Sequence, residues 1–545
     1  MESYHPCVFN ASNSDPNTMN YDKAMKDPVT RHLWIAAAEK EIRSLERLGT
    51  WKEVPITEAK NKIVPVHWIF KLKTLPDGTL DKMKGRVVVR GDLMDDYEYD
   101  THSPVCAWSS IRIVLTLSLL WGWHSCTCDY SNAFVHSFMP LDNPLWIHLP
   151  RGYKSEHGPN MCLQLLKSLY GTTFAPKLWS ETLFEALKVY GLTPSAHDPC
   201  LFTKPGVMMC AFVDDICCVF QDIKEKDVFL KSMKDQGFEL TMDGNISSFL
   251  GIKFEGPVNG CYNLTQPGLI DKILQATDME NCNPTYTPAT PGAALGKDPD
   301  GPVMTEPWSY KSVIGMLLYL STNTRPDITF AVSQVARFSH DPKVSHANAV
   351  KVIIRYLKGT RKEGTRMKPN GTLGLIAHSD ADFCGLYKID PMEDPNSAKS
   401  RMGYIISLGG CPLIWKSQLV SCITLATAES EYYALSRCLR TLIPIIRVLQ
   451  ETAQALRVSA PARATIQATA FEDNSAALQL ATTHRLTSRT RYFHTQSHHF
   501  WEYLKQHPQD LQIKAIASAL MDADYFTKAM PREGFEENRK RVQGW

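Results

Sequence analysis

The sequence predicts a mixed α/β fold, of the α+β kind, that is divided into more than one domain. Segments with strand-like alternation and segments with helical spacing of apolar residues follow one another along most of the 545 residues. An apolar content of 44% is enough for large cores, and a chain of this length exceeds one ordinary domain. A proline-rich run over residues 283–307 predicts a linker that splits the chain.

Composition excludes several classes of protein. No run of about 18 apolar residues could span a bilayer, and the polar N-terminus lacks the apolar centre of a secretory signal. The 15 cysteines are scattered through apolar segments without a Cys-x-x-Cys pair, which is typical of buried thiols in a reducing compartment. We therefore expect an intracellular protein. The formal net charge of +2 neither supports nor excludes a nucleic-acid partner.

The N-terminal part predicts a leader, a helix and two strands. Residues 1–30 are polar and aperiodic, which is typical of a flexible leader. From Trp34 to Leu48 apolar residues recur at helical spacing, and Gly49 is a suitable helix stop. Two strands with an intervening turn are expected next, at Val64 to Leu72, Pro76-Asp77-Gly78 and Arg86 to Arg90.

Beyond the proline-rich run, helices are predicted from Pro326 to Phe338 and from His346 to Leu357, the second with Gly359 as its C-cap. A basic cluster follows that we interpret as a solvated helix end: Arg355, Lys358, Arg361, Lys362, Arg366 and Lys368. A second α/β pattern then predicts strands at Leu373 to His378 and Gly403 to Leu408, a helix from Ala428 to Glu451, and a strand entering Glu472-Asp473.

Asp214 and Asp215 join two apolar runs rich in β-branched and small residues, a pattern that predicts a hairpin with an acidic tip. No Gly or Asn stands at the junction, so we expect the surrounding structure to hold the turn. Adjacent carboxylates repel each other, and a divalent cation such as magnesium would relieve the repulsion. An ordinary solvated turn explains the pair alone equally well.

A third carboxylate, Asp129, ends another short strand-like run. If that strand neighbours the hairpin, three carboxylates converge as two-metal phosphoryl transfer requires. One metal lowers the pKa of the attacking hydroxyl, and the other neutralises the leaving pyrophosphate.

Several ordered motifs resemble the reverse transcriptases of copia-type LTR retrotransposons. The most specific is the segment Lys167-Ser168-Leu169-Tyr170-Gly171-Thr172-Thr173-Phe174-Ala175-Pro176-Lys177-Leu178-Trp179. Others in the same order are His67-Trp68-Ile69-Phe70-Lys71, Lys84-Gly85-Arg86-Val87-Val88-Val89-Arg90-Gly91, His102-Ser103-Pro104-Val105, Phe249-Leu250-Gly251-Ile252, Thr324-Arg325-Pro326-Asp327-Ile328 and Arg355-Tyr356-Leu357-Lys358-Gly359-Thr360. The resemblance runs from about Leu33 to the C-terminus.

The resemblance implies that Asp129, Asp214 and Asp215 are the metal-binding acids of a polymerase palm. Phe212 stands where the family has tyrosine, so the ring is kept and the hydroxyl lost. Phe134 matches the aromatic that family members place against the sugar 2′ position, where a ring would exclude ribonucleotides; plain core packing is the alternative.

Nucleotide contacts are implied for a second set of residues. Gly171 and Pro176 match a turn under the nucleotide and template, where the absence of a Cβ permits close approach. Lys71, Lys73 and Arg86 are candidates for the triphosphate, with strand-edge solubility as the alternative. The segment Phe249-Leu250-Gly251 resembles the primer grip.

A second set of acids resembles the ribonuclease H domain of the same elements. Acids lie at strand ends and on a helix, which again suggests two metals, here activating water against an RNA phosphodiester. The resemblance assigns this role to Asp380, Glu431, Asp473 and Asp524. Glu431 is preferred to Glu429, which we expect to be solvated, and Asp382 and Asp522 are treated as neighbours. The histidines His494, His498 and His499 lack paired cysteines, so a packed or substrate-adjacent surface is favoured over zinc.

The implied architecture is a right-hand polymerase with fingers, palm and thumb, followed by a connection and a ribonuclease H-like α/β domain. The expected parts are a leader (1–30), fingers and palm (31–282), a linker (283–307), thumb or connection helices (308–370), a ribonuclease H-like domain (371–530) and a tail (531–545). Two Mg²⁺ ions are expected at each site, with Mn²⁺ as an alternative.

The implied function is RNA-directed DNA synthesis with ribonuclease H activity. The expected partners are an RNA template, a DNA primer strand, RNA–DNA hybrid and dNTPs, with no membrane; a homodimer is open, and in a full element Gag and integrase join them. We expect a cytoplasmic location, within a virus-like particle in a full element, with the nucleus as an alternative. The sequence shows no protease, integrase or Gag motif, so a fragment or a decayed copy is expected. The rival hypotheses are an inactive remnant that at most binds nucleic acid, and a structural domain reused by the host. Phe212 and the segment Gly91-Asp92-Leu93-Met94-Asp95-Asp96, which departs from the family, favour the remnant, whereas the intact acids favour the enzyme.

Overall fold

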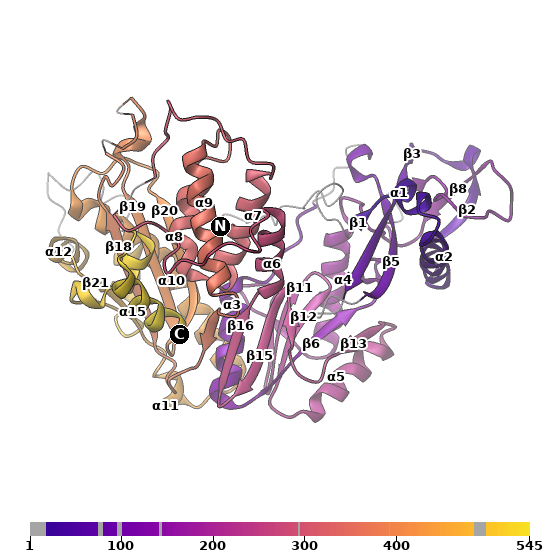
Figure 1. Ribbon diagram of the computed structural model, residues 1–545. Coiled ribbons are helices and arrows are strands. Elements are labelled where there is room, and N and C mark those ends of the chain that lie inside the picture. The colour runs from indigo at the N-terminus through magenta and orange to yellow at the C-terminus, as the bar shows by residue number, and fades with distance from the viewer. Residues whose placement is uncertain are drawn as a thin grey trace. The chain divides into compact units, whose positions relative to one another are not determined.

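The computed structural model describes residues 18–74, 80–94, 101–140, 144–292, 295–387, 389–391, 393–483 and 498–545 (Figure 1). Helices and strands alternate through them, so the predicted mixed α/β class is confirmed. The chain divides into two compact units, which are described here one at a time. The first comprises residues 1–105, 129–192 and 229–241, and the second comprises 106–128, 193–228 and 242–545.

Two small sheets and three helices build the first unit. The strand orders are β1-β4-β5 and β2-β8-β7-β3. The elements are β1 (Thr18–Met19), α1 (Tyr21–Lys26), α2 (Arg31–Arg47), β2 (Trp51–Pro55), β3 (Ile63–Val64), β4 (Val66–Thr74), β5 (Leu80–Val89), β7 (Trp146–Ile147), β8 (Met161–Leu165) and α4 (Ala175–Val189).

The predicted helix and strands of this unit are present, whereas the prediction of a flexible leader is wrong for residues 18–30. There Thr18 pairs with Lys71 of β4, and Ala24 of α1 is fully buried. Apolar contacts of α1 and one strand bridge are enough to order so polar a segment. Gly49 ends α2 as expected, with φ of +64°. The turn at Pro76-Asp77-Gly78 lies outside the described residues.

Aromatic packing holds α2 on the β4–β5 hairpin. The Trp68 and Phe70 rings stack with centroids 5.4 Å apart, and the Trp34 ring of α2 lies 5.3 Å from that of Phe70. Gly85 pairs with Phe70 across the strands, and a Cβ there would lie 3.0 Å from the Phe70 ring. The glycine therefore makes room for an aromatic ring over the neighbouring strand.

Two further sheets and a helical layer precede the C-terminal sheet in the second unit. The strand orders are β13-β6-β12-β11-β10-β9 and β14-β15-β16-β17. The elements, with those that straddle the unit boundary, are α3 (Trp108–Trp121), β6 (His124–Tyr130), β9 (Thr193–Pro194), β10 (Leu201–Lys204), β11 (Val207–Phe212), β12 (Asp215–Phe220), α5 (Lys224–Asp235), β13 (Leu240–Met242), β14 (Ser248–Phe249), β15 (Ile252–Val258), β16 (Cys261–Thr265), α6 (Pro267–Ala276), α7 (Tyr310–Asn323), α8 (Thr329–Ala336), α9 (Val344–Gly359) and β17 (Thr365–Met367).

The C-terminal sheet combines three antiparallel strands with two parallel ones. Its order is β20-β19-β18-β21-β22, with β18 parallel to β21 and β21 parallel to β22. Helix α10 packs on β18 and β19 (Figure 1). The elements are β18 (Leu375–Asp382), β19 (Arg401–Leu408), β20 (Cys411–Leu419), α10 (Thr427–Ala455), α11 (Ala460–Arg463), β21 (Ala468–Glu472), α12 (Ser475–Thr483), α14 (His498–Gln506), β22 (Leu511–Ala515) and α15 (Arg532–Gln543). Among the described residues, no helix combines the length and apolarity needed to cross a membrane.

The hairpin predicted around Asp214 is present. Strands β11 and β12 pair from Val207 and Phe220 to Phe212 and Asp215, which leaves Val213 and Asp214 as the turn. Val213 has φ of +57°, a left-handed conformation that β-branched residues rarely adopt. No glycine relieves this conformation, and support of the turn by the surrounding structure stays a prediction.

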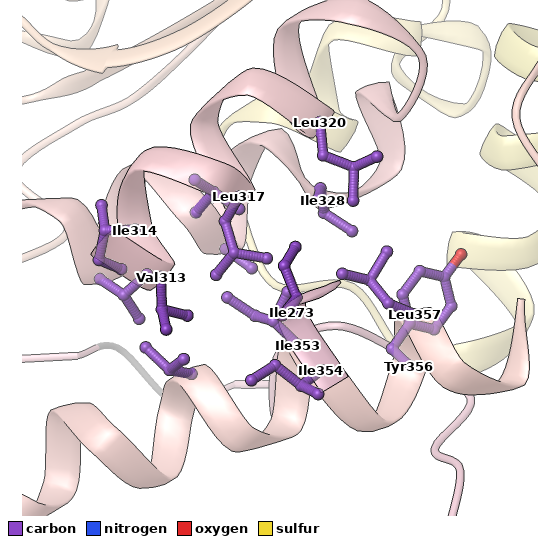
Figure 2. Close-up of a cluster of buried hydrophobic side chains, with 14 of the residues drawn as sticks. Ile273, Val313, Ile314, Leu317, Leu320, Ile328, Ile353, Ile354, Tyr356 and Leu357 are labelled. Atoms are coloured by element: carbon purple, nitrogen blue, oxygen red, sulfur yellow. The ribbon is translucent and has the colours of Figure 1, made fainter. Parts of the chain in front are cut away.

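The proline-rich segment does not separate two compact units, because residues 242–545 form one of them. Ala289, Leu295 and Met304 pack against the hydrophobic core of α6, α7, α8 and α9. The same core includes Ile405 and Trp415 of the C-terminal sheet. Figure 2 shows its centre, where side chains of α6, α7 and α9 interdigitate. The segment is therefore a packed cover of the helices and not a free linker.

Part of the basic cluster forms hydrogen bonds at the start of that segment. The prediction of a solvated helix end is therefore wrong for those residues. The Arg355 guanidinium donates to the Asn283 carbonyl at 2.6 Å, and the Lys358 ammonium to the Cys282 carbonyl at 2.7 Å. Arg361 pairs with Asp271 of α6. Gly359 is the last residue of α9 and not its cap, and a Cβ there would lie 2.9 Å from Pro284.

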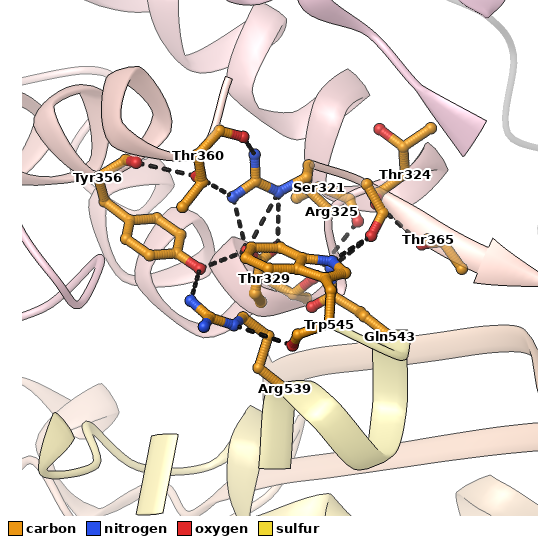
Figure 3. Close-up of polar contacts among 12 residues, drawn as sticks. Ser321, Thr324, Arg325, Thr329, Tyr356, Thr360, Thr365, Arg539, Gln543 and Trp545 are labelled. Atoms are coloured by element: carbon orange, nitrogen blue, oxygen red, sulfur yellow. Dashed lines mark hydrogen bonds and ion pairs between the residues drawn. The ribbon is translucent and has the colours of Figure 1, made fainter. Parts of the chain in front are cut away.

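A buried ion pair lies where α7 and α9 meet the C-terminal residues (Figure 3). Arg325 and Asp327 are joined at 2.7 Å, and both side chains are fully buried. Tyr356 of α9 donates its hydroxyl to Asp327 at 2.7 Å, and the Arg325 guanidinium lies 5.5 Å from the Trp545 ring. Residues 532–543, expected within a tail, form a helix with Phe535 and Val542 in the core.

Replacing Asp327 with alanine should strongly destabilise the second unit. The change leaves the Arg325 charge buried without its carboxylate, a situation that typically costs about 3–5 kcal/mol. Urea unfolding followed by circular dichroism measures the loss.

The matched control is Asp271→Ala, which removes the acid of a pair that is 41% and 47% exposed. An exposed pair of this kind is worth roughly 0–1 kcal/mol. Equal losses for the two variants would show that the buried pair has no special weight.

Candidate active sites

Three carboxylates predicted to act together lie at one end of the C-terminal sheet. Ligand oxygens of Asp380, Glu431 and Asp473 lie within 4.8 Å of one another. Asp380 is near the end of β18, and Asp473 follows the parallel neighbour β21, so both stand at the same sheet edge. Helix α10 packs on β18 and brings Glu431 from its first turns.

Burial and mutual repulsion make ionisation of this cluster unfavourable. Desolvation, followed by the charge of Asp380, raises the pKa of Glu431 to about 10. Desolvation and the charge of Asp524 raise the pKa of Asp380 to about 6. Glu431 Oε2 is buried and has no hydrogen-bond partner among the described residues. An orphaned carboxylate oxygen among other carboxylates fits a divalent cation, for which oxygen ligands are preferred.

Asp524, the fourth predicted acid, stands at the edge of the cluster. It lies on the short helix Asp522–Phe526, and Lys528 pairs with it at 2.8 Å. It is not among the three whose oxygens lie within 4.8 Å, although its charge contributes to the raised pKa of Asp380. The adjacent Thr527 donates its hydroxyl to Asp380.

Two glutamates differ from expectation. Glu429 is buried rather than solvated, and it accepts a hydrogen bond at 2.8 Å from the Leu425 backbone nitrogen, because it folds back over the start of α10. Glu472 is not one of the predicted site acids. It is nevertheless 1% exposed, and desolvation raises its pKa to about 8. The signal for Glu472 was present in the sequence, because it alternates with Ala470 and Ala468 on the buried face of β21.

The neighbouring acids and histidines have other partners or lie outside the description. Asp522 pairs with Arg541 at 2.8 Å, and desolvation raises the pKa of Asp382. His499 is exposed on α14, whereas His494 and the side chain of His498 lie outside the described residues. The described residues contain no further group of three metal-ligating side chains within this spacing, and the interpretation of the histidine cluster stays a prediction because two of its side chains lie outside them.

Of the predicted polymerase acids, Asp214 and Asp215 belong to the second unit and Asp129 belongs to the first. Asp214 is in the hairpin turn, Asp215 begins β12, and both are half-buried. Within the second unit, residues 124–128 of β6 neighbour β12 in the strand order. Asp129 is the next residue of β6 and is exposed, which leaves its carboxylate accessible. Phe212, which stands where the family has tyrosine, is half-buried at the end of β11.

Two of the residues expected near a nucleotide, Phe134 and Arg86, contact the Tyr170 ring in the first unit. The Phe134 ring meets the Tyr170 ring edge to face at 4.9 Å. The Arg86 guanidinium lies 4.5 Å from the Tyr170 ring centroid, and its Nε is buried without a hydrogen-bond partner among the described residues. Phe134 is only half-buried, so core packing does not account for the whole ring.

Lys71 and Lys73 lie on β4, where the register sets them opposite Lys84 and Lys82 of β5. Like charges directly opposite in a sheet are unfavourable, and a bound anion would offset that cost. Lys71 is exposed, and the side chain of Lys73 lies outside the description.

The structure explains why position 171 requires a glycine. Its φ is +92°, and a Cβ there would lie 2.2 Å from the Val89 carbonyl oxygen. The backbone at the end of β5 can therefore approach Gly171 closely only because this residue has no Cβ. Pro176 occupies the first turn of α4, where proline needs no hydrogen-bond donor. In the segment resembling a primer grip, the Leu250 carbonyl accepts a hydrogen bond at 2.5 Å from the Tyr319 hydroxyl.

Residues 49–291 match the family model described as reverse transcriptase (RNA-dependent DNA polymerase). The chain is 30% identical over 547 residues to the retrovirus-related Pol polyprotein from transposon RE1 of Arabidopsis thaliana, covering 99% of this chain and 35% of that protein. It is 28% identical to the corresponding polyprotein from transposon TNT 1-94 of Nicotiana tabacum, covering 97% and 39%. A putative transposon Ty5-1 protein of Saccharomyces cerevisiae is 27% identical over 56% of this chain and 98% of its own length.

These similarities place the fold in a known class, the reverse transcriptases. More particularly, the chain belongs to the family of retrotransposon Pol polyproteins of the copia type, as its motifs indicated. It spans little more than a third of the length of the two plant relatives.

Replacing Glu431 with glutamine should stabilise the metal-free protein at alkaline pH. The folded pKa of about 10 exceeds the ordinary value of 4.5, so the folded state holds this proton more tightly than the unfolded chain does. The stability linked to Glu431 is full below pH 4.5 and falls as the pH rises toward 10. At pH 8 the variant should therefore melt at least about 2 °C higher than the wild type in EDTA, with the difference vanishing near pH 4.

Magnesium should raise the melting temperature of the wild type at pH 8 and do so much less for Glu431→Gln. Glu429→Gln is the matched control, because it alters a buried glutamate on the same helical turn that bonds to the backbone. It should lose stability and keep the magnesium response. A full response in Glu431→Gln would remove this residue from the ligands.

Proposed function

We propose that the chain is an RNA-directed DNA polymerase with ribonuclease H activity. The observation that carries the nuclease part is the buried cluster of Asp380, Glu431 and Asp473. The polymerase part rests on the reverse transcriptase family match and on the acidic β11–β12 hairpin beside β6.

In the polymerase part, Asp129, Asp214 and Asp215 would hold two Mg²⁺ ions. Their oxygen-only donor set suits this ion, with Mn²⁺ as the alternative. Val213 adopts a left-handed conformation in the turn, and this turn places Asp214 at the tip of the hairpin. The primer 3′-hydroxyl and the incoming dNTP would meet at these acids on a primed RNA or DNA template.

Residues of the first unit would receive the nucleotide. Arg86, Lys71 and Lys73 supply positive charge for the triphosphate, and the half-buried Phe134 ring would oppose a ribose 2′-hydroxyl. Gly171 and Pro176 would shape the turn behind them, with Gly171 held against β5. Nucleic acid in the primer grip would approach Leu250 and Gly251, both of which have positive φ.

In the nuclease part, Asp380, Glu431 and Asp473 would hold Mg²⁺, with Asp524 at the edge of the site. Bound metal would supply a water of lowered pKa and neutralise charge on the phosphate. Thr527 orients the Asp380 carboxylate by its hydrogen bond, and Lys528 holds Asp524. Burial at the base of the site limits the entry of water from that side.

The substrates proposed are an RNA template, a DNA primer strand, dNTPs and RNA–DNA hybrid, whose A-form shape is read through backbone and 2′-hydroxyl contacts. Gag and integrase would accompany the chain in a full element, in a cytoplasmic particle. The alternative is a remnant that at most binds nucleic acid. It is disfavoured by the cluster, since placing Asp380 and Glu431 in a buried site beside Asp473 raises the pKa of both acids, a cost that a bound cation would offset.

Asp214→Asn/Asp215→Asn should abolish magnesium-dependent DNA synthesis on a primed RNA template, by at least about a hundredfold. The reason is loss of the proposed metal ligands without a change of shape. Primer extension by the purified chain measures it. Asp227→Asn, on the exposed face of α5, is the control and should retain wild-type synthesis. No synthesis by folded wild-type protein would favour the remnant.

Asp380→Asn should abolish hydrolysis of the RNA strand in a labelled hybrid while leaving primer extension intact. The hairpin double variant should show the opposite pattern, since its acids belong to the other site. Side-by-side assays of both activities on both variants test this. Hydrolysis that persists in Asp380→Asn would assign the cleavage to another site or to a contaminant.

A further inference from the structure

A pocket of about 160 Å³ adjoins the acidic cluster in the second unit. Its lining includes Asp382, Lys399, Arg401, Thr527 and Lys528. Thr527 belongs to both places, because its hydroxyl also binds Asp380. The volume is room for roughly five water molecules, and so for a small oxyanion.

Arg401 is the unusual member of this lining. The residue is 3% exposed, and its guanidinium bonds only to neutral side chains: Ser333 at 2.6 Å, Gln334 at 3.0 Å and Ser417 at 3.2 Å. Among the described residues, no carboxylate lies within ion-pair distance of it, and the acid that acts on it electrostatically is Asp382, its partner across β18 and β19. Burial lowers its pKa to about 9, so it is a cation at neutral pH.

The other buried arginines show how such a charge is ordinarily satisfied. Arg325 has the Asp327 carboxylate at 2.7 Å. Arg112 directs its guanidinium at three backbone carbonyls, those of Leu413, Thr322 and Asn323. Arg401 has hydroxyl and amide partners and the Phe330 ring at 5.5 Å, and it forms part of the pocket lining.

Further positive charge converges on the pocket. The Lys399 ammonium binds the Asn396 side chain, a neutral partner, at 2.9 Å. Lys528 is paired with Asp524, and Asp382 is the acid among the residues named in the lining. A buried cation with no carboxylate at ion-pair distance among the described residues, a lysine beside it and an adjoining cavity form a receptor for an anion.

We propose that this pocket binds a backbone phosphate of the RNA–DNA hybrid next to the bond that the acidic cluster cleaves. This inference rests on the proposed nuclease function, since the hybrid supplies the phosphate. Arg401 and Lys399 draw one phosphate into the pocket and fix the strand, while Thr527 links the pocket to Asp380. The substrate is thus positioned by charge on one side of the cluster and by metal ligands on the other.

Two variants test the pocket, Lys399→Gln and Arg401→Gln. The first removes a half-buried lysine, and the second keeps a polar side chain that can still bond to Ser333 and Ser417. Lys351→Gln is the matched control, because it removes a positive charge that is paired with Glu306 outside the pocket. Circular dichroism and melting temperature establish that each variant is folded.

Hybrid affinity is measured over a range of salt concentrations with Ca²⁺ in place of Mg²⁺, and cleavage with Mg²⁺. We expect both pocket variants to weaken binding about fivefold to tenfold, with the slope of log K against log salt reduced by roughly one unit. KM for hybrid cleavage should rise with kcat nearly unchanged. Inorganic phosphate should raise the melting temperature of the wild type, relative to chloride at equal ionic strength, and fail to do so in both variants.

The outcomes separate the two proposals. Cleavage by the wild type, with unchanged affinity, salt slope and KM in folded pocket variants, overturns the pocket and leaves the nuclease standing. Absence of hybrid cleavage by the wild type overturns the nuclease and, with it, the role given to the pocket. A phosphate response equal in wild type and variants also overturns the pocket as a phosphate site.

Discussion

Repulsion among buried carboxylates is the constraint around which the C-terminal sheet is organised. Asp380, Glu431 and Asp473 come from three separate elements, and burial together with neighbouring carboxylates raises the pKa of Asp380 and of Glu431. Thr527 donates a hydrogen bond to Asp380, and Lys528 pairs with Asp524. These contacts still leave one carboxylate oxygen of Glu431 without a hydrogen-bond partner among the described residues.

The elements carrying strong periodic patterns were predictable. The helix ending at Gly49, the β11–β12 hairpin and α10 all stand close to their predicted places, because apolar spacing and turn chemistry act over a few residues. No order of strands was predicted for the C-terminal sheet. Pairing of β18 with β21 joins residues almost a hundred positions apart, which no local pattern encodes.

Failures of prediction came where tertiary contacts override composition. Residues 18–30 are polar, yet one bridge and one buried alanine order them. The proline-rich segment cannot form a core of its own, but the carbonyls of Cys282 and Asn283 receive Lys358 and Arg355 from a helix distant in sequence. Glu429 was expected to be solvated and is buried, because its carboxylate bonds to the backbone at the start of α10. The acids proposed for the two sites rest on the family motifs, which assign them residue by residue.

The helical layer and the C-terminal sheet share one hydrophobic core, so they cannot be separated without exposing it. Ile405 and Trp415 of the sheet, together with Phe535 of α15, complete the same core as α7 and α9. A recombination junction placed at the proline-rich segment would divide that core and expose both halves to water. Exchange of C-terminal segments between related elements is therefore expected to preserve residues 267–545 as one inherited block, in which the helices stay with the sheet whose core they share.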